Sequence, residues 1–314
     1  MSKPPFSTLV GQLPYAPQES IIDSYSYTGD ILSFKRCSWQ YGTFSHFRFT
    51  KALPIQAWFG DVIHMSIELL FRQFTGDIFD STGKLAIGKL PTDEDVVYHC
   101  KECIDILKSK GMYARLSDHN SAKELLKTFN SREGVSFYSR IAASEVRLES
   151  IRHPANGKPP YVINGVVDVL IAPDQKSLEI WDYKAMDKPD NGTQEGKQKL
   201  RELENQMFTY FEIVQSLFPS KQISQAVLYF VNELKPGGSA NPEHRIDLAA
   251  TSIIKKIKAS KIEADKTVEE IRSCKSKGVF EFPKKGTVDT KTCDACEWRW
   301  SCPSTTKIYK INAP

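Results

Sequence analysis

The chain has 314 residues, of which 40% are hydrophobic, 25% charged and 11% aromatic, a mixture typical of a globular protein and not of a disordered one. No apolar run approaches the ~20 residues that cross a bilayer. The N-terminal stretch lacks an apolar core before a small-residue cleavage site, so we expect no membrane span, no secretory signal and a cytoplasmic location. The net charge of +4 permits an anionic partner without requiring one, and the seven cysteines favour ligands or buried thiols over disulfides in such a compartment.

The N-terminal region is predicted to be helical after an extended arm. Residues 1–20 contain four prolines and little periodicity, and they form the predicted arm. A short helix is predicted to begin at Thr28, and a longer one covers residues 54–74, where apolar side chains recur at helical spacing. Gly60 precedes His64 by one turn of this longer helix, which would let another group approach closely. Because a helical histidine is more often a core or surface group than a ligand, a role for His64 needs support from elsewhere in the chain.

A helical insertion is predicted over residues 76–139, with helices at 92–110 and 118–139. Its sequence carries no recognisable chemistry. Cys100 and Cys103 are three residues apart within the first helix, and no second pair of cysteines follows closely. We therefore predict buried thiols at these positions rather than metal ligands.

Three strands follow in a predicted meander, and the last two carry acidic residues where apolar ones are expected. Asp168 lies near the end of one strand, and Asp182 lies near the end of the next. Lys184 follows Asp182 by two residues, so both side chains should project from one face of the strand, with Tyr183 on the other. A lone strand aspartate is usually an edge or turn residue, but buried acids are costly unless they are paired or bound to a cation. The three strands are predicted over residues 144–152, 161–171 and 177–184, and the two acids and the lysine at the ends of the last two indicate a metal site.

A strand, a helix and a further strand then predict a crossover, so the sheet is mixed. Residues 185–199 are polar and predict a loop, and residues 200–217 form an amphipathic helix. Gln206 and Tyr210 lie one turn apart on this helix and share a face, as surface residues or as part of a site. The next strand is predicted over residues 225–233.

A loop over residues 234–245 and a basic helix over residues 246–274 complete the predicted elements. A run of lysines like that of the helix is usually a solvated face, and phosphate binding is the alternative. The predicted fold is therefore α/β. A mixed central sheet, made of a three-stranded meander plus a crossover strand, is flanked by helices in a single domain over residues 21–314.

The C-terminal region contains three cysteines within ten residues, in the spacing C-x2-C-x5-C over 293–302. Such a cluster indicates the ligands of one metal centre that needs a fourth. Cys37 is the candidate fourth ligand, which would join the N-terminal helix to the C-terminal region. Four thiolates suit either zinc or a four-iron cluster, and the spacing does not choose between them. The three clustered cysteines are Cys293, Cys296 and Cys302.

Taken together, these features resemble the PD-(D/E)XK nuclease superfamily, and within it the RecB-like branch with an iron–sulfur cluster, which includes CRISPR-associated iron–sulfur exonucleases and AddB-type nuclease domains. The resemblance covers Tyr27 to Pro303 except for the helical insertion. Two departures are visible: Ser38 follows the first cysteine where the family often has proline, and the acid before the lysine is aspartate rather than glutamate. The matching motifs are Gly60-x3-His64, Gly165-Val-Val-Asp168, Asp182-Tyr183-Lys184, Gln206-x3-Tyr210 and the four cysteines.

The resemblance implies a restriction-endonuclease-like core and a metal-dependent DNA nuclease. His64, Asp168 and Asp182, with the carbonyl of Tyr183, would hold Mg²⁺ or Mn²⁺. Lys184 would orient the attacking water or balance the charge on the phosphate. Gln206 and Tyr210 would contact DNA or steady Lys184, Glu145 is a weaker candidate for the same cleft, and a 4Fe-4S cluster would be held by Cys37, Cys293, Cys296 and Cys302.

Three other readings of the sequence stay open. The first is a nucleic-acid-binding module that kept the fold and lost cleavage, and the second is an accessory subunit of a helicase–nuclease complex. The third is an interaction protein with a zinc site and no active centre. The chain contains no GxxxxGK[ST] motif, so any helicase partner must be a separate chain. DNA repair, recombination, phage replication and antiphage or CRISPR systems are all compatible settings.

Overall fold

The computed structural model describes residues 22–49, 55–155, 157–238 and 241–305, so the arm predicted over residues 1–20 lies outside the described part. The chain divides into two compact units. Among the described residues, the first unit lies within residues 55–148 and 166–253, and the second lies within residues 22–49, 149–165 and 254–305. The predicted single domain over residues 21–314 thus contains two centres of packing, and the chain passes between them repeatedly.

The strands of the first unit form a mixed sheet, as predicted. β2 pairs with β3, β3 and β4 are antiparallel, and β4 and β5 are parallel after the crossover through α7. An additional strand, β6, pairs antiparallel with β5. The elements are β2 (Ile141–Arg152), β3 (Tyr161–Ile171), β4 (Ser177–Lys184), α7 (Gln194–Leu217), β5 (Gln222–Phe230), the 3₁₀ turn η3 (Val231–Leu234) and β6 (Glu243–Asp247).

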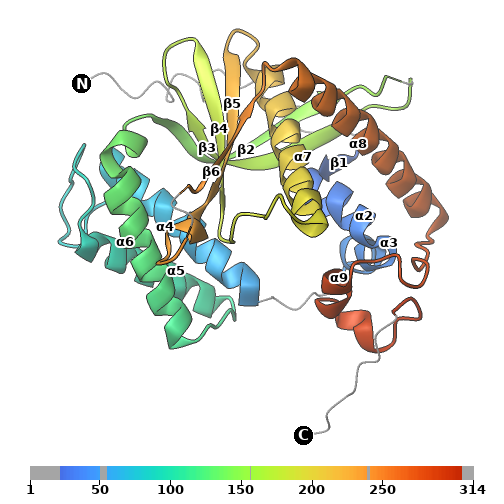
Figure 1. The fold of residues 1–314 in the computed structure, drawn as a ribbon, viewed down its shortest axis with the longest axis horizontal. Coiled ribbons are helices and arrows are strands. Elements are labelled where there is room, and N and C mark those ends of the chain that lie inside the picture. Colours follow the sequence, from blue (N-terminus) through green and yellow to red (C-terminus); the bar gives the residue numbers. More distant parts are fainter. Residues whose placement is uncertain (1–21, 50–54, 156, 239–240, 306–314) are drawn as a thin grey trace, which may run out of the picture. The chain divides into compact units, whose positions relative to one another are not determined.

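One face of this sheet packs against the helical insertion. α4 (Ile55–Thr75), α5 (Asp93–Ser109) and α6 (Leu116–Tyr138) lie against one another beside the strands (Figure 1). Alternate strand residues such as Trp181, Tyr183 and Tyr229 face these helices and share one apolar core with them, as expected from the two-residue period of a strand. α7 covers β4 and β5, with Gln206 reaching the opposite face of β4.

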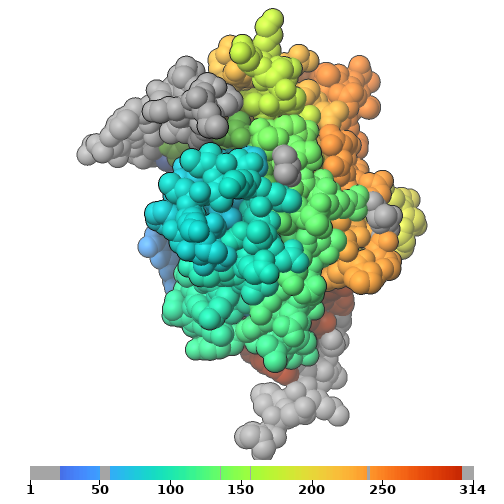
Figure 2. All heavy atoms as spheres, turned by 90° about the vertical axis from the view of Figure 1, so that its left-hand side faces the viewer, coloured from blue at the N-terminus to red at the C-terminus, as the bar shows by residue number. Residues whose placement is uncertain are grey.

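The predicted thiols of the insertion are buried, as expected. Cys100 and Cys103 are both fully buried on α5, and burial raises the pKa of Cys100 to about 12 and that of Cys103 to about 11. They are therefore core residues. The insertion also exposes Phe79 and Ile87 in the loop before α5. Figure 2 shows the face of the molecule on which the insertion, coloured cyan to green, is turned toward the viewer.

The second unit holds the first short elements and the C-terminal region. β1 pairs in parallel with the start of β3, with Ser24 opposite Val162. Tyr161 on β3 donates a hydrogen bond to Asp265 on α8 at 2.6 Å and accepts one from Arg152 at 3.0 Å, which ties the helix to the strands. The elements are β1 (Ser24–Ser26), the π-helical turn η1 (Tyr27–Leu32), α2 (Ser33–Arg36), α3 (Ser38–Tyr41), η2 (Gly42–His46), α8 (Thr251–Lys277), α9 (Thr290–Asp294) and the 3₁₀ turn η4 (Glu297–Trp300).

Several predicted boundaries are wrong. The strand predicted over residues 225–233 covers Gln222–Phe230 and is followed by the 3₁₀ turn Val231–Leu234, and the strand predicted over residues 144–152 begins at Ile141. The predicted loop at 234–245 contains the start of β6, because pairing with β5 outweighs the low strand propensity of Glu243-His244-Arg245. α8 begins at Thr251 and not at residue 246. α7 begins inside the predicted loop at 185–199, because Thr193 caps it by accepting the Gly196 N–H at 3.0 Å. Within the described residues, no helix is both long and apolar enough to cross a membrane.

Asp95 at the start of α5 provides a pH-dependent test of this packing. Its buried carboxylate accepts the Ser81 N–H and the Thr92 N–H, each at 2.8 Å. Burial alone would raise the pKa of Asp95, but these hydrogen bonds outweigh burial and lower it. Because the folded pKa lies below the unfolded value of about 3.9, the stabilisation is present above about pH 4 and is lost as the pH falls through the folded pKa.

We expect Asp95→Asn to lower the free energy of unfolding by about 2 kcal/mol at pH 7, because an amide offers only one acceptor oxygen to these donors. The difference from wild type should shrink below pH 4. Urea unfolding at pH 7 and pH 3 measures it. Asp93→Asn is the matched control, since Asp93 is exposed in the same helical turn. A difference that stays constant with pH would contradict this account.

Candidate metal centre and cysteine pocket

The candidate metal centre is assembled from α4 and three consecutive strands of the first unit. α4 buries Val62, Ile63 and Ile67 in the core, which leaves His64 on the neighbouring helical face, directed at the strands. β3 and β4 pair Val169 with Trp181, so Asp168 and Asp182 come next to each other one residue further along. The strand pairing and the helical period thus bring together groups that are distant in the sequence.

Three potential ligands converge at this point. The nearest ligand atoms of His64, Glu145 and Asp168 all lie within 4.8 Å of one another. Nδ1 of His64 lies 3.4 Å from Oδ2 of Asp168 and 3.7 Å from Oε1 of Glu145. The other ring nitrogen, Nε2, lies 3.1 Å from the carbonyl oxygen of Tyr183. The predicted ligands His64, Asp168 and Tyr183 are therefore grouped, and Glu145 joins them.

Glu145, the weaker candidate in the sequence analysis, lies within the group of potential ligands in the structure. It lies on β2, which alternates polar and apolar residues, so a carboxylate there resembles an ordinary solvent-facing one. Its φ is +50°, in the left-handed region that a non-glycine residue adopts only at a cost of about 1–2 kcal/mol. Such a conformation re-aims the side chain. The sequence contains the acid but no signal of its backbone conformation.

Tyr183 contributes its main chain to the centre and its ring to the core. Its N–H donates to Oδ2 of Asp168 at 2.8 Å, and its carbonyl faces His64. On the opposite face of β4, the Tyr183 ring packs edge-on against Phe129 of α6, with ring centroids 5.8 Å apart, and against Phe137. The predicted opposition of Tyr183 to Asp182 and Lys184 is thus confirmed, and the insertion fixes the position of the carbonyl.

A second network surrounds Lys184. Its ammonium lies 2.5 Å from Oδ2 of Asp182 and donates to Oε1 of Gln206 at 3.1 Å. The Gln206 amide donates to Oδ1 of Asp182 at 3.3 Å and to the hydroxyl of Tyr210 at 2.8 Å. The predicted residues Gln206 and Tyr210 therefore adjoin the lysine. Asp182 is turned toward Lys184, which projects from the same face, and is not one of the three residues grouped within 4.8 Å.

The charges of the centre favour a cation where His64 meets the acids. Burial alone would lower the pKa of His64, but Asp168, Glu145 and Asp182 outweigh it and raise that pKa well above its usual value. Burial would raise the pKa of Asp168, but His64 and Lys184 lower it overall. Burial, with the charge of Asp168, raises the pKa of Asp182 to about 6 against the opposing effect of Lys184. The oxygen and imidazole donors fit Mg²⁺ or Mn²⁺.

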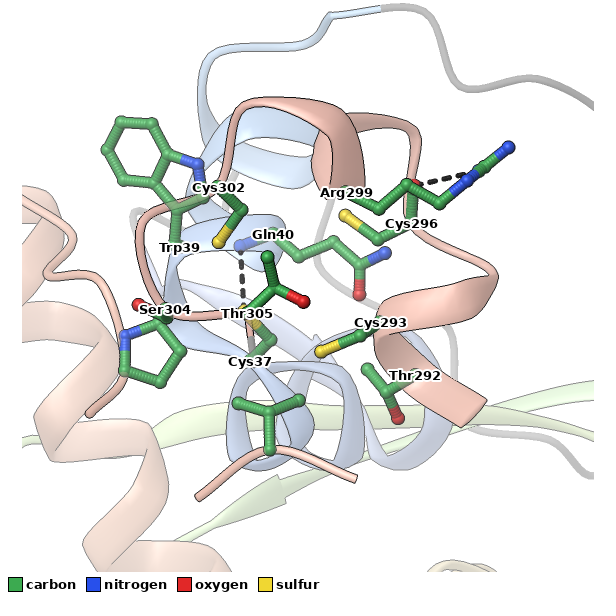
Figure 3. Close-up of a pocket in the computed structure, with 12 residues that line it drawn as sticks. Cys37, Trp39, Gln40, Thr292, Cys293, Cys296, Arg299, Cys302, Ser304 and Thr305 are labelled. Atoms are coloured by element: carbon green, nitrogen blue, oxygen red, sulfur yellow. Dashed lines mark hydrogen bonds between the residues drawn. The ribbon is translucent and has the colours of Figure 1, made fainter. Parts of the chain in front are cut away.

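The second unit contains a pocket lined by four cysteines, the same four that the sequence singled out. Cys37 follows α2, whereas Cys293, Cys296 and Cys302 come from the region of α9 and η4. Figure 3 shows the four sulfur atoms around the pocket, with the Gln40 N–H donating to Sγ of Cys37 at 3.4 Å. Burial and the nearby Cys296 and Cys302 raise the pKa of Cys37. Four thiols around one space fit a thiolate-bound metal centre, either zinc or a four-iron cluster.

Comparison with known proteins finds a matching family and solved structures of similar fold, among them the following two. A model of the PD-(D/E)XK nuclease superfamily matches residues 29–303. The crystal structure of a "Putative exonuclease" from Eubacterium rectale is similar over 100% of this chain and 96% of its own, with a TM-score of 0.51 and 12% identity, which supports the fold alone. The structure of SSO0001 is 15% identical and covers 95% of this chain and 93% of its own, with a TM-score of 0.38, too low to support a conclusion. A search of curated proteins finds no match.

Proposed function

This chain belongs to the PD-(D/E)XK nuclease superfamily, and on that premise we propose that it is a Mg²⁺- or Mn²⁺-dependent deoxyribonuclease that hydrolyses phosphodiester bonds at DNA ends or in single strands. The observation that carries the proposal is the grouping of His64, Glu145 and Asp168 within 4.8 Å beside the pair formed by Asp182 and Lys184. A binding module without activity would not need this set of charges, of which Asp168 and Asp182 are buried and the others half-buried, because such charges are costly to maintain.

The ligands of the ion would come from four elements. His64, Asp168, Asp182 and the Tyr183 carbonyl are the proposed ligands, and Glu145 is added to them because of its place in the group. When bound, such an ion polarises the scissile phosphate and lowers the pKa of a bound water. The left-handed backbone at Glu145 supports a functional role, since strain of this kind concentrates at active sites.

Besides the proposed ion, Lys184 brings positive charge to the centre. Its ammonium would donate to the attacking water or to the phosphate oxygen on which charge builds. Gln206 accepts from Lys184 and donates to Asp182, which holds the ammonium at one position. Tyr210 accepts from Gln206 and so orients its amide. Gln206 and Tyr210 are thus proposed to position Lys184.

The cysteine pocket supports an assignment to the RecB-like branch with an iron–sulfur cluster. Cys37, Cys293, Cys296 and Cys302 would bind one 4Fe-4S cluster, and zinc is the alternative occupant. The pocket joins a residue near the start of the second unit to three near its end, so the bound group would act mainly as a structural cross-link.

Cleavage of defined DNA substrates tests the proposed function. End-labelled linear and closed circular DNA, each single- and double-stranded, are incubated with the protein and Mg²⁺ or Mn²⁺. We expect degradation of linear DNA, which Asp182→Asn should abolish. Glu179→Gln is the matched control, since Glu179 lies on the same strand, hydrogen-bonded to Trp181 rather than to Lys184. Equal activity of wild type and Asp182→Asn would refute the nuclease assignment, and cleavage of circles would exclude a strict requirement for ends.

A further inference from the structure

Four large aromatic side chains on the second unit are exposed to solvent in two short segments. Phe47 and Phe49 follow η2, with exposed fractions of 49% and 58%, and Trp298 and Trp300 belong to η4, with 37% and 47%. The ring of Phe49 meets that of Trp298 at 6.4 Å, almost perpendicular to it. We call these four residues the aromatic face. None of these four rings lines the cysteine pocket.

Arginines alternate with these rings. Arg48, between the two phenylalanines, is exposed and has φ +58°, a left-handed conformation that costs free energy in a non-glycine residue. The guanidinium of Arg299 lies 4.6 Å from the centre of the Trp300 ring and donates to the carbonyl of Cys296 at 2.9 Å. Figure 3 shows the Arg299 side chain leading away from the sulfur atoms. Arg299 is thus held beside an exposed ring, and Arg48 lies between two exposed rings in the sequence.

The two segments are fixed before any partner binds. The Phe47 N–H donates to the carbonyl of Gly42 at 2.8 Å, and the Phe49 N–H donates to that of Thr43 at 3.2 Å. These bonds keep the phenylalanines against η2. The ring of Phe47 also packs edge-on against Phe280, with ring centroids 6.0 Å apart, so these contacts reduce the entropy that a partner would have to offset in ordering the segment.

The charge of the chain is concentrated in the same unit. Among the described residues, the second unit contains 17 lysines and arginines and 11 acidic residues, a net charge of +6, whereas the first unit contains 21 basic and 26 acidic residues, a net charge of −5. The segment 33–49 beside the cysteine pocket has three basic residues and no acidic one, namely Lys35, Arg36 and Arg48. This excess of positive charge favours a polyanionic partner for the second unit over a partner surface with few acidic groups.

From these contacts we infer that the aromatic face binds single-stranded nucleic acid, with unpaired bases stacked on Phe49, Trp298 and Trp300 and phosphates held by Arg48 and Arg299. Exposed rings stack on bases only when those bases are not already paired within a duplex, and neighbouring arginines contact the backbone. The inference rests on the proposed function, since it names the form of the substrate. It adds a binding site remote in sequence from the metal ligands and independent of their chemistry.

Equilibrium binding tests the inference. All proteins carry Lys184→Ala so that the probe stays intact, and fluorescence anisotropy follows a labelled 20-nucleotide oligothymidine and a duplex of the same length at two salt concentrations. We expect tighter binding of the single strand. Trp298→Ala and Trp300→Ala should each weaken it by roughly 5- to 150-fold, as the loss of one base stack does. Arg48→Ala should reduce the salt dependence of binding. Quenching of tryptophan fluorescence by the oligomer is the second readout.

The matched control is Tyr113→Ala, which removes an equally exposed ring, 66% accessible, from the insertion. Thermal melting confirms that each variant is folded. Unchanged affinity in Trp298→Ala and Trp300→Ala would overturn the inference, as would binding of neither form of DNA by the parent protein. Concentration-dependent self-association that Trp298→Ala abolishes would assign the face to a second copy of the chain instead. The two proposals fail separately. If the aromatic face does not bind DNA but the protein that retains Lys184 still cleaves it, only this inference is refuted. If that protein does not cleave DNA, the proposed function is refuted.

Discussion

Replacing Lys184 by alanine should lower the rate of DNA hydrolysis by roughly 1,000-fold or more. The ammonium is the only side-chain cation in contact with Asp182 among the described residues, and an aimed donor at developing negative charge is worth about 100- to 1,000-fold by itself. Its loss also removes the donor that Oε1 of Gln206 contacts. Single-turnover cleavage of an end-labelled single strand at saturating Mg²⁺ measures the effect.

A second readout separates the loss of chemistry from a loss of fold. Lys184 opposes the rise in the pKa of Asp182 to about 6, so its removal should raise that pKa further. Infrared titration of the metal-free variant should show a carboxyl that stays protonated at higher pH than in wild type. Lys188→Ala is the control, because the Lys188 ammonium donates to the carbonyl of Glu243 at 2.7 Å and does not contact Asp182. Activity of Lys184→Ala within threefold of wild type would exclude the proposed role.

The second large effect concerns the cysteine pocket. Cys37→Ser should abolish stoichiometric metal binding and lower the melting temperature by roughly 5–10 °C. A site saturated a hundredfold above its dissociation constant contributes about 2.7 kcal/mol to stability, and each kcal/mol is worth roughly 2–4 °C in a domain of this size. Metal analysis and calorimetry of anaerobically purified protein measure both quantities.

The matched control is Cys274→Ser, since Cys274 on α8 does not line the pocket. Its metal content and melting temperature should equal those of wild type. Absorption near 400 nm together with iron and sulfide would identify the cluster, and colourless protein with one zinc would identify the alternative. Full metal content in Cys37→Ser would remove that residue from the ligand set.

Local periodicity predicted most of the centre. The two-residue period of β4 placed Asp182 and Lys184 on one face and Tyr183 on the other, as the contacts in the structure confirm. The four-residue spacing on α7 placed Gln206 beside Tyr210. The mixed sheet followed from the order of strand, helix and strand. These features depend on neighbours in the chain, so the sequence contains them.

What could not be predicted depends on contacts between distant residues. The left-handed φ of Glu145 is imposed by its surroundings, and nothing in Ser144-Glu145-Val146 distinguishes it from a solvent-facing acid. β6 is polar and short, and only its pairing with β5 makes it a strand. The division of residues 21–314 into two units likewise follows from which segments pack together, not from a change of composition along the chain.

The packing of the Tyr183 ring against α6 limits how far this chain can be shortened. The insertion supplies none of the proposed ligands, so its residues 76–139 are an obvious target for replacement by a short linker. Such a replacement would remove Phe129 and Phe137, the rings against which Tyr183 packs while its carbonyl faces His64. The shortened chain would keep every proposed catalytic residue and misplace one proposed ligand, so we expect α6 to belong to the smallest functional piece.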